Sequence, residues 1–540
     1  MKRRGLFVGM ALATLAGLLL GRAQPVLAAP PSSWSSATAL DHDSDLRSDA
    51  FGRTVAVSGD LAVVSDSLQE VGHYLGVGQI CTYTHTDGAW PREGSPLVLP
   101  DGKPEDFFGY CVALSGGTLL ASVASHLAEA NPVPGSVYAF SHTASGWQQQ
   151  GPKLVANDGY PADGFGTALA VSGDTAVISA PGQQGEYKVY VFVRQGGAWA
   201  QQGPALSHPG GAQGRYFGTS VAISGDTLLI GAAAYADPAT TGAAFVFVRT
   251  AGTWTQQGPP LSSGVELDQY GYAVALNGDT AVVGAPGANG GDGAAHIYQR
   301  DATGVWTQQG PTQIGPPASN GQFGSTVSVW GTQAVIAAPN LEGTNYVGSG
   351  ALFLFARVAN IWAQSGVPQH VSTRSGVDMD HNLGQALAMS GPNVLVGSLT
   401  YYGSAYLVRA CASGSCCTGD LECPLDEYCS AGGSCQVRQV SADGGANEAE
   451  GGATNTAGAA GVLEVAGAPA GGAPLAAGGA ASAGAPTDDS CANTGTCTAP
   501  VPDRAISSCG CRVGSRPTNG APTVLAVLLG LVLLRRRRRT

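Results

Sequence analysis

Residues 270–286 read YGYAVALNGDTAVVGAP, and variants of this stretch recur seven times between residues 49 and 410. The stretch opens with an aromatic residue and Gly, continues as a short alternating strand, turns at Gly278-Asp279, and ends in a second, more apolar strand. Gly readily adopts the positive φ that a two-residue hairpin turn requires. Each copy therefore predicts a β-hairpin.

The aromatic-Gly pair marks the start of every copy. It occurs at Phe51-Gly52, Phe108-Gly109, Phe165-Gly166, Phe217-Gly218, Tyr270-Gly271 and Phe323-Gly324, with Leu383-Gly384 as a degenerate seventh copy. After a variable loop comes a third strand with aromatics, such as residues 189–192, and a Trp then opens a fourth strand. These Trp residues are Trp90, Trp147, Trp199, Trp254, Trp306 and Trp362. Four antiparallel strands repeated seven times predict an all-β fold, a seven-bladed β-propeller over residues 29–410.

The seventh copy has a third strand at residues 405–408 but no Trp after it. An unassigned Trp34 lies 17 residues before Phe51, a spacing that matches the distance from Trp to the next aromatic-Gly pair in the other copies. We expect residues near Trp34 to supply the fourth strand of the last blade. Strands from both chain ends would then close the ring, so that the first and last blades are tied together and present no unprotected strand edge. The alternative is that Trp34 is an isolated surface aromatic.

Several second strands end in similar triplets, such as residues 179–181, 284–286 and 337–339. With the aromatic-Gly pairs, these triplets resemble the FG-GAP repeat proteins, whose best-known members are the N-terminal propellers of integrin α-subunits. The resemblance covers nearly all of residues 49–410. It implies ligand recognition on one face of a propeller, and often calcium in an Asp-rich loop between the first and second strands. That hairpin is cut down here to Ser-Gly-Asp, which cannot surround an ion that takes six or more oxygens.

Propeller geometry divides the connections between two faces. The first-second and third-fourth hairpins share one face and are short and uniform here. The second-third loops and the inter-blade connections share the other face and are long and variable, at residues 66–78, 122–134, 233–241, 286–293, 340–349, 91–106 and 363–382. Loops on a rigid scaffold commonly carry recognition. We expect binding on this long-loop face; the alternative is that the loops only cover the blade ends.

A candidate calcium site precedes the first blade. Asp41, Asp43, Asp45 and Asp49 have the spacing of a calcium-binding loop, although Leu46 stands where Gly would allow the sharp bend. A solvated acidic loop is the alternative interpretation. Calcium is therefore a possible cofactor by this pattern, and no other cofactor is expected.

Composition and motifs limit the function. The net charge of -12 and the lack of a basic stripe exclude nucleic acid as an expected partner. The chain has no zinc-protease, nucleophile-elbow, phosphate-loop or dinucleotide motif, so no catalytic residue is expected. We expect an exported binding or adhesion module for an extracellular protein or glycan. The alternatives are a secreted hydrolase that uses carboxylates in the propeller channel and a purely structural envelope protein.

The N-terminus has the pattern of a secretory signal peptide over residues 1–28. Lys2, Arg3 and Arg4 precede an uncharged apolar run, and small residues lie at the expected cleavage site after Ala28. A transmembrane anchor is the alternative. Export would place the clustered cysteines in a disulfide-permissive compartment.

After the propeller, residues 411–436 form a predicted Cys-rich disulfide module, with Cys411, Cys416, Cys417, Cys423, Cys429 and Cys435 as its candidate half-cystines. Residues 437–490 are rich in Ala, Gly, Pro and Ser, and this composition predicts a disordered linker. Residues 491–520 contain Cys491 and Cys497, which are expected to pair, and then Cys509 and Cys511.

Residues 521–540 contain a short apolar span followed by five arginines. A span of about 14 residues gives roughly 21 Å of helix, which is shorter than a bilayer core of ~30 Å. The arginines fix a cytoplasmic end. This tail resembles the myxobacterial C-terminal sorting domain, which implies cleavage and lipidation at Cys509 or Cys511 and display at the cell surface or outer membrane. A plain membrane anchor at the C-terminus is the alternative.

Overall fold

The computed structural model describes the propeller apart from several loops. The described residues are 34–35, 37–40, 50–68, 76–124, 135–159, 163–182, 187–210, 216–234, 241–317, 320–341, 350–370, 382–398, 403–410, 427–429 and 435–437. The predicted signal peptide, linker, sorting region and terminal apolar span lie outside them. No helix within these ranges is long and apolar enough to cross a membrane.

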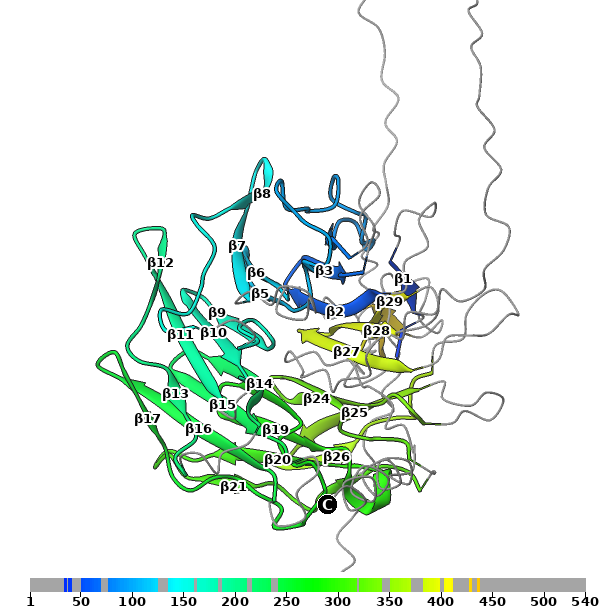
Figure 1. The fold of residues 1–540 in the computed structure, drawn as a ribbon. Helices are drawn as coiled ribbons and strands as arrows, with labels where there is room; N and C mark the ends of the chain where they lie inside the picture. Colours follow the sequence, from blue (N-terminus) through cyan, green and yellow to red (C-terminus); the bar gives the residue numbers. More distant parts are fainter. Residues whose placement is uncertain are drawn as a thin grey trace, which may run out of the picture. The chain divides into compact units, whose positions relative to one another are not determined.

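Seven antiparallel sheets, here called blades one to seven in chain order, form an all-β propeller (Figure 1). Blades one to three consist of β2 (Phe51–Ser58), β3 (Leu61–Asp66), β4 (Gln79–Thr84); β5 (Val112–Ser115), β6 (Thr118–Val123), β7 (Ser136–Thr143), β8 (Gly146–Gln149); and β9 (Leu169–Ser172), β10 (Thr175–Ala180), β11 (Lys188–Gln195), β12 (Ala198–Gln201), with β13 (Leu206–Ser207) at the edge.

Blades four to seven follow the same order. They consist of β14 (Phe217–Ser224), β15 (Thr227–Ala232), β16 (Ala243–Thr250), β17 (Thr253–Gln256); β18 (Ala273–Asn277), β19 (Thr280–Ala285), β20 (Ala294–Arg300), β21 (Trp306–Gln308), with β22 (Gln313–Ile314) at the edge; β23 (Thr326–Trp330), β24 (Gln333–Ala338), β25 (Ala351–Val358), β26 (Ile361–Gln364); and β27 (Leu383–Ser390), β28 (Asn393–Ser398), β29 (Ser404–Arg409), β1 (Thr38–Ala39). The prediction of seven four-stranded units is confirmed, with one exception in blade one.

Blade one lacks a regular fourth strand. Its outer edge is reduced to isolated bridges, one of them between Tyr83 and Arg92. Pro91 directly follows Trp90 there and has no backbone N–H to donate to a sheet ladder. The fourth strand predicted at Trp90 is therefore shortened.

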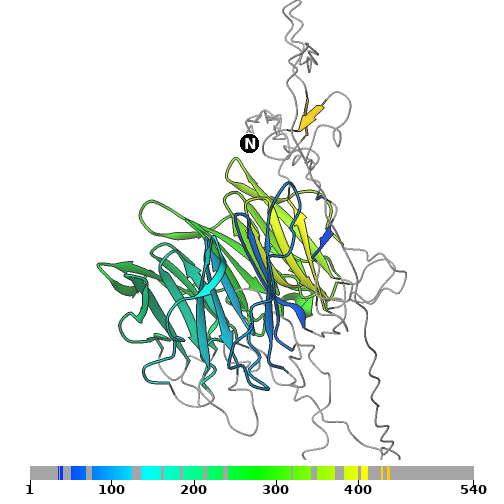
Figure 2. The ribbon, with the colours of Figure 1, turned by 90° about the horizontal axis from the view of Figure 1, so that it is seen from above.

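The N-terminal segment completes blade seven, as the position of Trp34 predicted. The short strand β1 pairs antiparallel with β29, and Trp34 forms a bridge with Ala410. Ser35 donates its backbone N–H to the carbonyl of Arg409 at 3.1 Å, and its hydroxyl accepts the backbone N–H of Arg409 at 2.8 Å. Figure 2 shows the blue strands of blade one next to the yellow strands of blade seven.

Neighbouring blades touch through glycine at very short range. Gly52 of the first aromatic-Gly pair has φ of +85°, and a Cβ atom there would lie 2.2 Å from the carbonyl oxygen of Ser404 in blade seven. On the other side of the contact, a Cβ atom at Gly397 would lie 2.0 Å from the carbonyl oxygen of Gly52. Two further boundaries repeat this arrangement: a Cβ atom at Gly231 would lie 2.0 Å from the carbonyl oxygen of Gly271, and one at Gly284 would lie 2.0 Å from that of Gly324. The blades can approach this closely only because neither partner has a side chain.

The aromatic residue before each of these glycines fills the space between two blades. Phe51, Phe108, Phe165, Phe217 and Phe323 are almost fully buried. Phe217 packs edge-on against Phe245 at 5.6 Å between ring centroids, and Phe323 packs in the same way against Phe353 at 5.1 Å. Such edge-to-face packing is the favoured geometry for aromatic pairs and adds to the free energy gained by burial.

A ring of side-chain hydrogen bonds joins the inner strands. The last residue of one inner strand accepts the backbone N–H of the turn glycine in the next blade: Gly116 to Ser58, Gly173 to Ser115, Gly225 to Ser172, Gly278 to Ser224, Gly331 to Asn277 and Gly59 to Ser390. The donor-acceptor distances are between 2.9 and 3.1 Å. The bond from Gly59 to Ser390 joins blades one and seven, and the six bonds connect every pair of neighbouring blades except six and seven.

Of the predicted Cys-rich module, the structure describes only the strands β30 (Glu427–Cys429) and β31 (Cys435–Val437). They pair antiparallel, with Cys429 opposite Cys435. The other cysteines of this module and Cys491, Cys497, Cys509 and Cys511 lie outside the described residues, so their disulfide and lipidation assignments stay predictions.

Replacing Gly52 by Ala is expected to destabilise the propeller far more than replacing Gly59 by Ala. Both glycines have positive φ, which costs an Ala about 1–2 kcal/mol. Gly59 has no other atom within 4 Å of the added Cβ, whereas Gly52 meets a blade-seven carbonyl. We expect Gly52→Ala to lower the free energy of unfolding by at least about 2 kcal/mol more. Urea denaturation of both variants measures this, and equal losses would contradict the proposed ring contact.

Candidate functional site

One face of the propeller carries a repeated ion pair. In blade three, Arg194 donates from Nε and Nη2 to Oδ1 of Asp174, at 2.7 and 2.6 Å. Blades four and five repeat this geometry at the same distances with Arg249 and Asp226, and with Arg300 and Asp279. Each Asp follows the turn glycine between the first and second strands. The predicted division of the hairpins between two faces is therefore confirmed: both short hairpins meet on what we call the short-turn face.

The same arginines connect neighbouring blades. Arg249 lies over the ring of Trp254 at 5.1 Å and donates from Nη1 to the hydroxyl of Thr175 in blade three. Trp254 in turn donates from Nε1 to the side-chain carbonyl of Gln202, at 3.0 Å. Charge-assisted hydrogen bonds and cation–π contacts of this kind fix a planar guanidinium in one orientation.

Histidines take the place of these arginines in the first two blades. His85 stacks on Trp90 at 4.9 Å, and its Nδ1 lies 3.4 Å from Asp60. His142 contacts Trp147 and lies 2.7 Å from Glu93 of blade one. Their equivalent positions after the third strand correspond to a shared structural role in holding the third-fourth hairpin.

These contacts also show what the turn carboxylates do in this protein. Asp174, Asp226 and Asp279 bind guanidinium groups of their own blades. Among the described residues, no group of three or more His, Cys, Asp or Glu side chains is placed to hold a metal ion. The candidate calcium loop with Asp41, Asp43, Asp45 and Asp49 lies outside the described residues, and calcium binding there stays a prediction.

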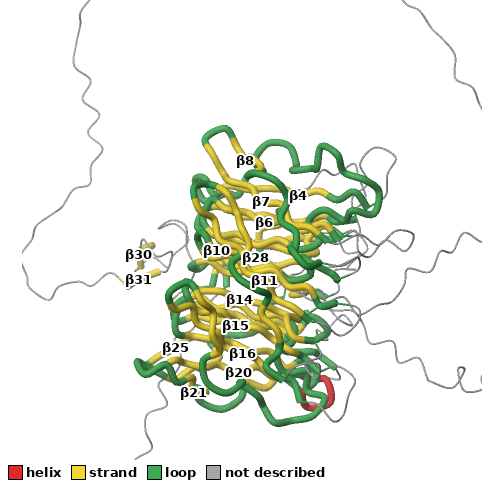
Figure 3. Tube along the Cα trace, turned by 60° about the vertical axis from the view of Figure 1, so that its left-hand side comes forward, coloured by secondary structure: helices red, strands yellow, loops and turns green. Residues whose placement is uncertain are grey.

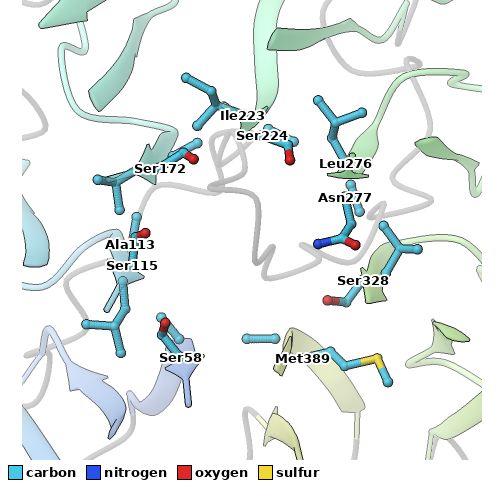
Figure 4. A pocket seen from close by; sticks show the side chains of 18 of the residues that line it. Ser58, Ala113, Ser115, Ser172, Ile223, Ser224, Leu276, Asn277, Ser328 and Met389 are labelled. Atoms are coloured by element: carbon cyan, nitrogen blue, oxygen red, sulfur yellow. The ribbon is translucent and has the colours of Figure 1, made fainter. Parts of the chain in front are cut away.

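The seven inner strands surround an axial channel of about 390 Å³ (Figure 4). Each strand contributes a four-residue pattern that ends, in five blades, with Ala, an apolar residue and Ser; residues 55–58 of blade one are an example. Figure 4 shows Ser58, Ser115, Ser172, Ser224 and Asn277 arranged around this channel. Hydroxyl and amide groups therefore ring the channel where the inner strands meet the short turns.

Blade six departs from this pattern at two positions. Ser328 stands where the other blades have Ala, and Trp330 stands where they have Ser or Asn. The indole of Trp330 has only a donor and cannot accept a hydrogen bond from the next turn. Its side chain lines the channel and remains 45% exposed. A large exposed aromatic ring thus interrupts an otherwise polar ring.

The described residues that line the channel include no Asp, Glu, His, Lys, Arg or Cys. The described lining therefore contains no carboxylate of the kind that a channel hydrolase was expected to use. The channel offers hydroxyl, amide and backbone groups, which can bind a neutral ligand but do not by themselves form a catalytic constellation.

The opposite, long-loop face carries a ring of residues with left-handed backbone. Each residue lies just before the aromatic-Gly pair or its Leu-Gly equivalent, and in Phe107, Tyr216, Gln269 and Gln322 the carbonyl accepts the N–H three residues on. The non-glycine members are Phe107, Tyr216, Gln269, Gln322 and Asn382, with φ between +48° and +71°. All five are partly exposed. The backbone is therefore constant around this rim, while the side chain differs from blade to blade.

The remainder of this face is only partly described. The predicted loops 66–78, 122–134, 233–241, 340–349 and 363–382 each contain residues outside the described ranges, whereas 286–293 and 91–106 are described in full. Loop 286–293 contains the single described helical turn, η3 (Ala288–Gly291), which lies on the side away from the β7–β8 hairpin tip (Figure 3).

Blade five contains a buried polar cluster where blades four and six have Phe. Tyr270 donates to the hydroxyl of Tyr298 at 2.7 Å, and His296 lies edge-on to the Tyr270 ring at 5.0 Å. Burial, with the neighbouring Tyr298, raises the pKa of Tyr270 well above its usual value. Burial also lowers the pKa of His296. The cluster is therefore neutral near pH 7.

The neutral state of His296 predicts a loss of stability in acid. Its pKa is lowered in the folded protein, so below about pH 6.5 the unfolded chain binds a proton that the folded one resists. Stability then falls as pH drops, by up to about 1.4 kcal/mol per pH unit for one proton. Urea unfolding between pH 7 and 5 should give a smaller slope for His296→Asn than for the natural protein. His208, whose pKa is also lowered by burial, should leave a residual slope; an unchanged slope would contradict this assignment.

Comparison with known proteins supports the repeat assignment. A sequence model of the FG-GAP repeat matches residues 147–192, 199–247 and 261–298, which cover strands of blades two to five. The chain thus contains FG-GAP repeats within a seven-bladed β-propeller. No curated protein sequence matches the chain.

Solved structures similar to this chain are distant. The β-propeller domain of the Trilobed protease from Pyrococcus furiosus shares 10% identity over 66% of this chain and 94% of that one, with a TM-score of 0.37. The periplasmic gluconolactonase of Pseudomonas aeruginosa shares 15% identity over 60% and 89%, with a TM-score of 0.38. The WD40 domain of SCAP from fission yeast shares 10% identity over 70% and 98%, with a TM-score of 0.37. Similarity at this level assigns no activity to the chain.

No sequence motif predicted the residues that hold the short-turn face together. An Arg or His recurs five residues before the fourth-strand Trp, as in Arg194-Trp199 and Arg249-Trp254, and this spacing could have revealed the pairing. Trp330 was also missed. Aligning the seven inner strands position by position would have shown it as the exception among Ser and Asn residues.

Proposed function

We propose that this chain is an exported, surface-anchored propeller that binds an extracellular protein or glycan through its long-loop face. The sequence supports export and anchoring through its signal-like N-terminus and its Cys- and Arg-containing tail. The FG-GAP repeats agree with this proposal, since the family includes extracellular ligand-binding propellers. Recognition is the role; no catalytic residue is assigned.

The ring of left-handed residues on the long-loop face is the observation that carries this proposal. A constant backbone presents Phe107, Tyr216, Gln269, Gln322 and Asn382 at equivalent points of successive blades. Left-handed conformation is unfavourable for these residue types, and such strain is concentrated in proteins at functional sites. Variable side chains on an invariant frame are typical of binding surfaces.

The short-turn face differs in this respect. Its turn carboxylates and arginines are satisfied by one another in blades three to five, and its hairpins are nearly uniform. The alternatives of a channel hydrolase and of a purely structural envelope protein gain no specific observation in their favour. The gluconolactonase and the protease propeller are similar to this chain only at the level reported above.

Glycine substitutions on the long-loop face test the proposal. Glycine prefers the left-handed conformation that these positions already have, so Tyr216→Gly, Gln269→Gly and Gln322→Gly together should preserve or raise stability while removing the side chains. We expect the triple variant of the full chain to lose at least tenfold in binding to the probes that the natural protein retains. The probes are an immobilised panel of neutral and acidic polysaccharides and a biotinylated preparation of surface proteins.

The matched control is Ala251→Gly with Ala359→Gly. Both residues also have positive φ, but they lie at third-fourth hairpin tips on the short-turn face. This control should bind as the natural protein does. Equal binding by the triple variant and the natural protein would refute recognition by the left-handed ring.

A further inference from the structure

The wall of the axial channel departs from the repeat on one side. Around the channel, one position of the first strand carries Ala in six of the seven blades, and the position two residues further on carries Ser in five. The departures are Asn277 in blade five, and Ser328 and Trp330 in blade six. The two blades are neighbours, and their first strands β18 and β23 lie side by side. One stretch of the wall therefore differs chemically from the rest.

Trp330 interrupts the hydrogen bonds that join the inner strands. At this position in the other blades, Ser or Asn accepts the backbone N–H of the next turn glycine, as Ser224 does from Gly278 at 3.0 Å. The corresponding donor in blade seven is the N–H of Gly391, which an indole cannot accept. The Trp330 side chain is also 45% exposed, so much of its apolar surface gains no free energy of burial. Residues that break a repeat at the expense of stability are expected at functional sites.

Asn277 presents its amide nitrogen to the channel. Its side-chain carbonyl accepts the backbone N–H of Gly331 at 3.0 Å, and this bond fixes the orientation of the amide. The NH₂ group lies on the other side of the amide, and Figure 4 shows it directed into the channel. Among the described residues, no side chain or carbonyl accepts a hydrogen bond from this group. Asn277 thus has donors available for a ligand.

Ser328 adds a hydroxyl where the other blades have a methyl group. It is partly exposed and lines the channel, and Figure 4 shows its hydroxyl directed inward. This hydroxyl forms no hydrogen bond to any residue that the structure describes, and it can both donate and accept. β18 and β23 are the edge strands of their sheets, so their outer backbone N–H and C=O groups lie along the same wall. This stretch therefore offers several neutral donors and acceptors.

The size and charge of the channel limit what it can bind. Its volume of about 390 Å³ lies in the range of small-molecule sites and is too small for a folded protein. The described lining has no charged side chain, so nothing there offsets the desolvation of a charged ligand. A fitting ligand is therefore small and uncharged, with one apolar face and several polar groups.

We propose that the channel wall formed by blades five and six binds a neutral saccharide. A pyranose ring has an apolar face of C–H groups and a rim of hydroxyls that donate and accept hydrogen bonds. The apolar face packs on Trp330, and the ring hydroxyls bind the Asn277 amide and the Ser328 hydroxyl. The site lies where the inner strands meet the short turns. It is separate from the left-handed ring of the long-loop face and does not rest on the proposed function.

Other neutral ligands match these residues less well. An apolar molecule would pack on Trp330 but would leave the Asn277 amide and the Ser328 hydroxyl desolvated without partners, which is unfavourable. A peptide supplies hydrogen-bonding groups from a flexible chain, whose ordering opposes binding. A saccharide carries the apolar face and the polar rim on one rigid ring, so it loses less conformational entropy.

Variants that restore the repeat test the site without disturbing the fold. Trp330→Ser, Ser328→Ala and Asn277→Ser each introduce the residue that most other blades carry. The probes are glucose, galactose, mannose, N-acetylglucosamine and cellobiose, titrated into the full chain and followed by calorimetry. We expect at least one sugar to bind the natural protein with a Kd of about 1 mM or lower. Trp330→Ser should weaken this binding at least tenfold, and each of the other two variants should weaken it about threefold.

Three controls test position, charge and the opposite face. Ser115→Ala removes a hydroxyl from the wall across the channel in Figure 4 and should bind the sugar within twofold of the natural protein. Glucuronate, which adds a carboxylate to the same kind of ring, should bind at least tenfold more weakly than the best neutral sugar. The triple glycine variant of the long-loop face should bind the sugar normally, so failure of this proposal is distinguishable from failure of the proposed function.

The proposal is overturned if none of the sugars binds, or if Trp330→Ser binds them as the natural protein does. Binding of a capped Gly-Pro-Gly peptide in place of every sugar would assign the site to peptides and would also overturn it. Urea unfolding of Trp330→Ser supplies an independent readout. Its stability should be unchanged or higher, because a hydroxyl there can accept the N–H of Gly391. A large loss of stability together with lost binding would make Trp330 a structural residue and contradict the proposal.

Discussion

The fold depends on a backbone contact that only glycine permits. Gly52, Gly271 and Gly324 each meet a glycine of the preceding blade so closely that a single added carbon would overlap a carbonyl oxygen. The contact sets the separation of adjacent sheets at these three blade boundaries, whereas Gly109, Gly166, Gly218 and Gly384 each meet a side chain of the preceding blade. The buried aromatic residue before the glycine fills the remaining space. Because the same contact recurs between blades seven and one, the repeats close into a ring instead of continuing as an open array.

The fold could be predicted largely from periodicity. The aromatic-Gly pairs gave the number of blades, and the single missing Trp placed Trp34 in the last blade, as the bridge between Trp34 and Ala410 confirms. The short fourth strand of blade one was not predicted, since the effect of Pro91 on one ladder is lost in a pattern shared by seven copies. A repeat is recognised from what its copies share, so a residue such as Pro91 that alters one copy is easily overlooked.

The candidate sites were harder to predict because their residues converge only after the blades pack. Arg249, Asp226 and Thr175 come from two blades and form one contact set. The left-handed ring depends on backbone angles that sequence does not specify for Phe107 or Gln322. The departure of blade six was visible in the residues themselves, because Trp330 replaces the Ser or Asn that the other inner strands carry. The calcium loop and the sorting tail remain sequence predictions.

Ring closure by β1 has a consequence for the order of assembly. Ser35 and Arg409 are 374 positions apart and are hydrogen-bonded to each other. A ribosome therefore releases this early strand long before its partner exists, and contacts so distant along the chain form slowly. The segment near Ser35 therefore remains unpaired until Arg409, 374 positions later, has been synthesised. A propeller of this kind therefore completes its fold only at the end of synthesis.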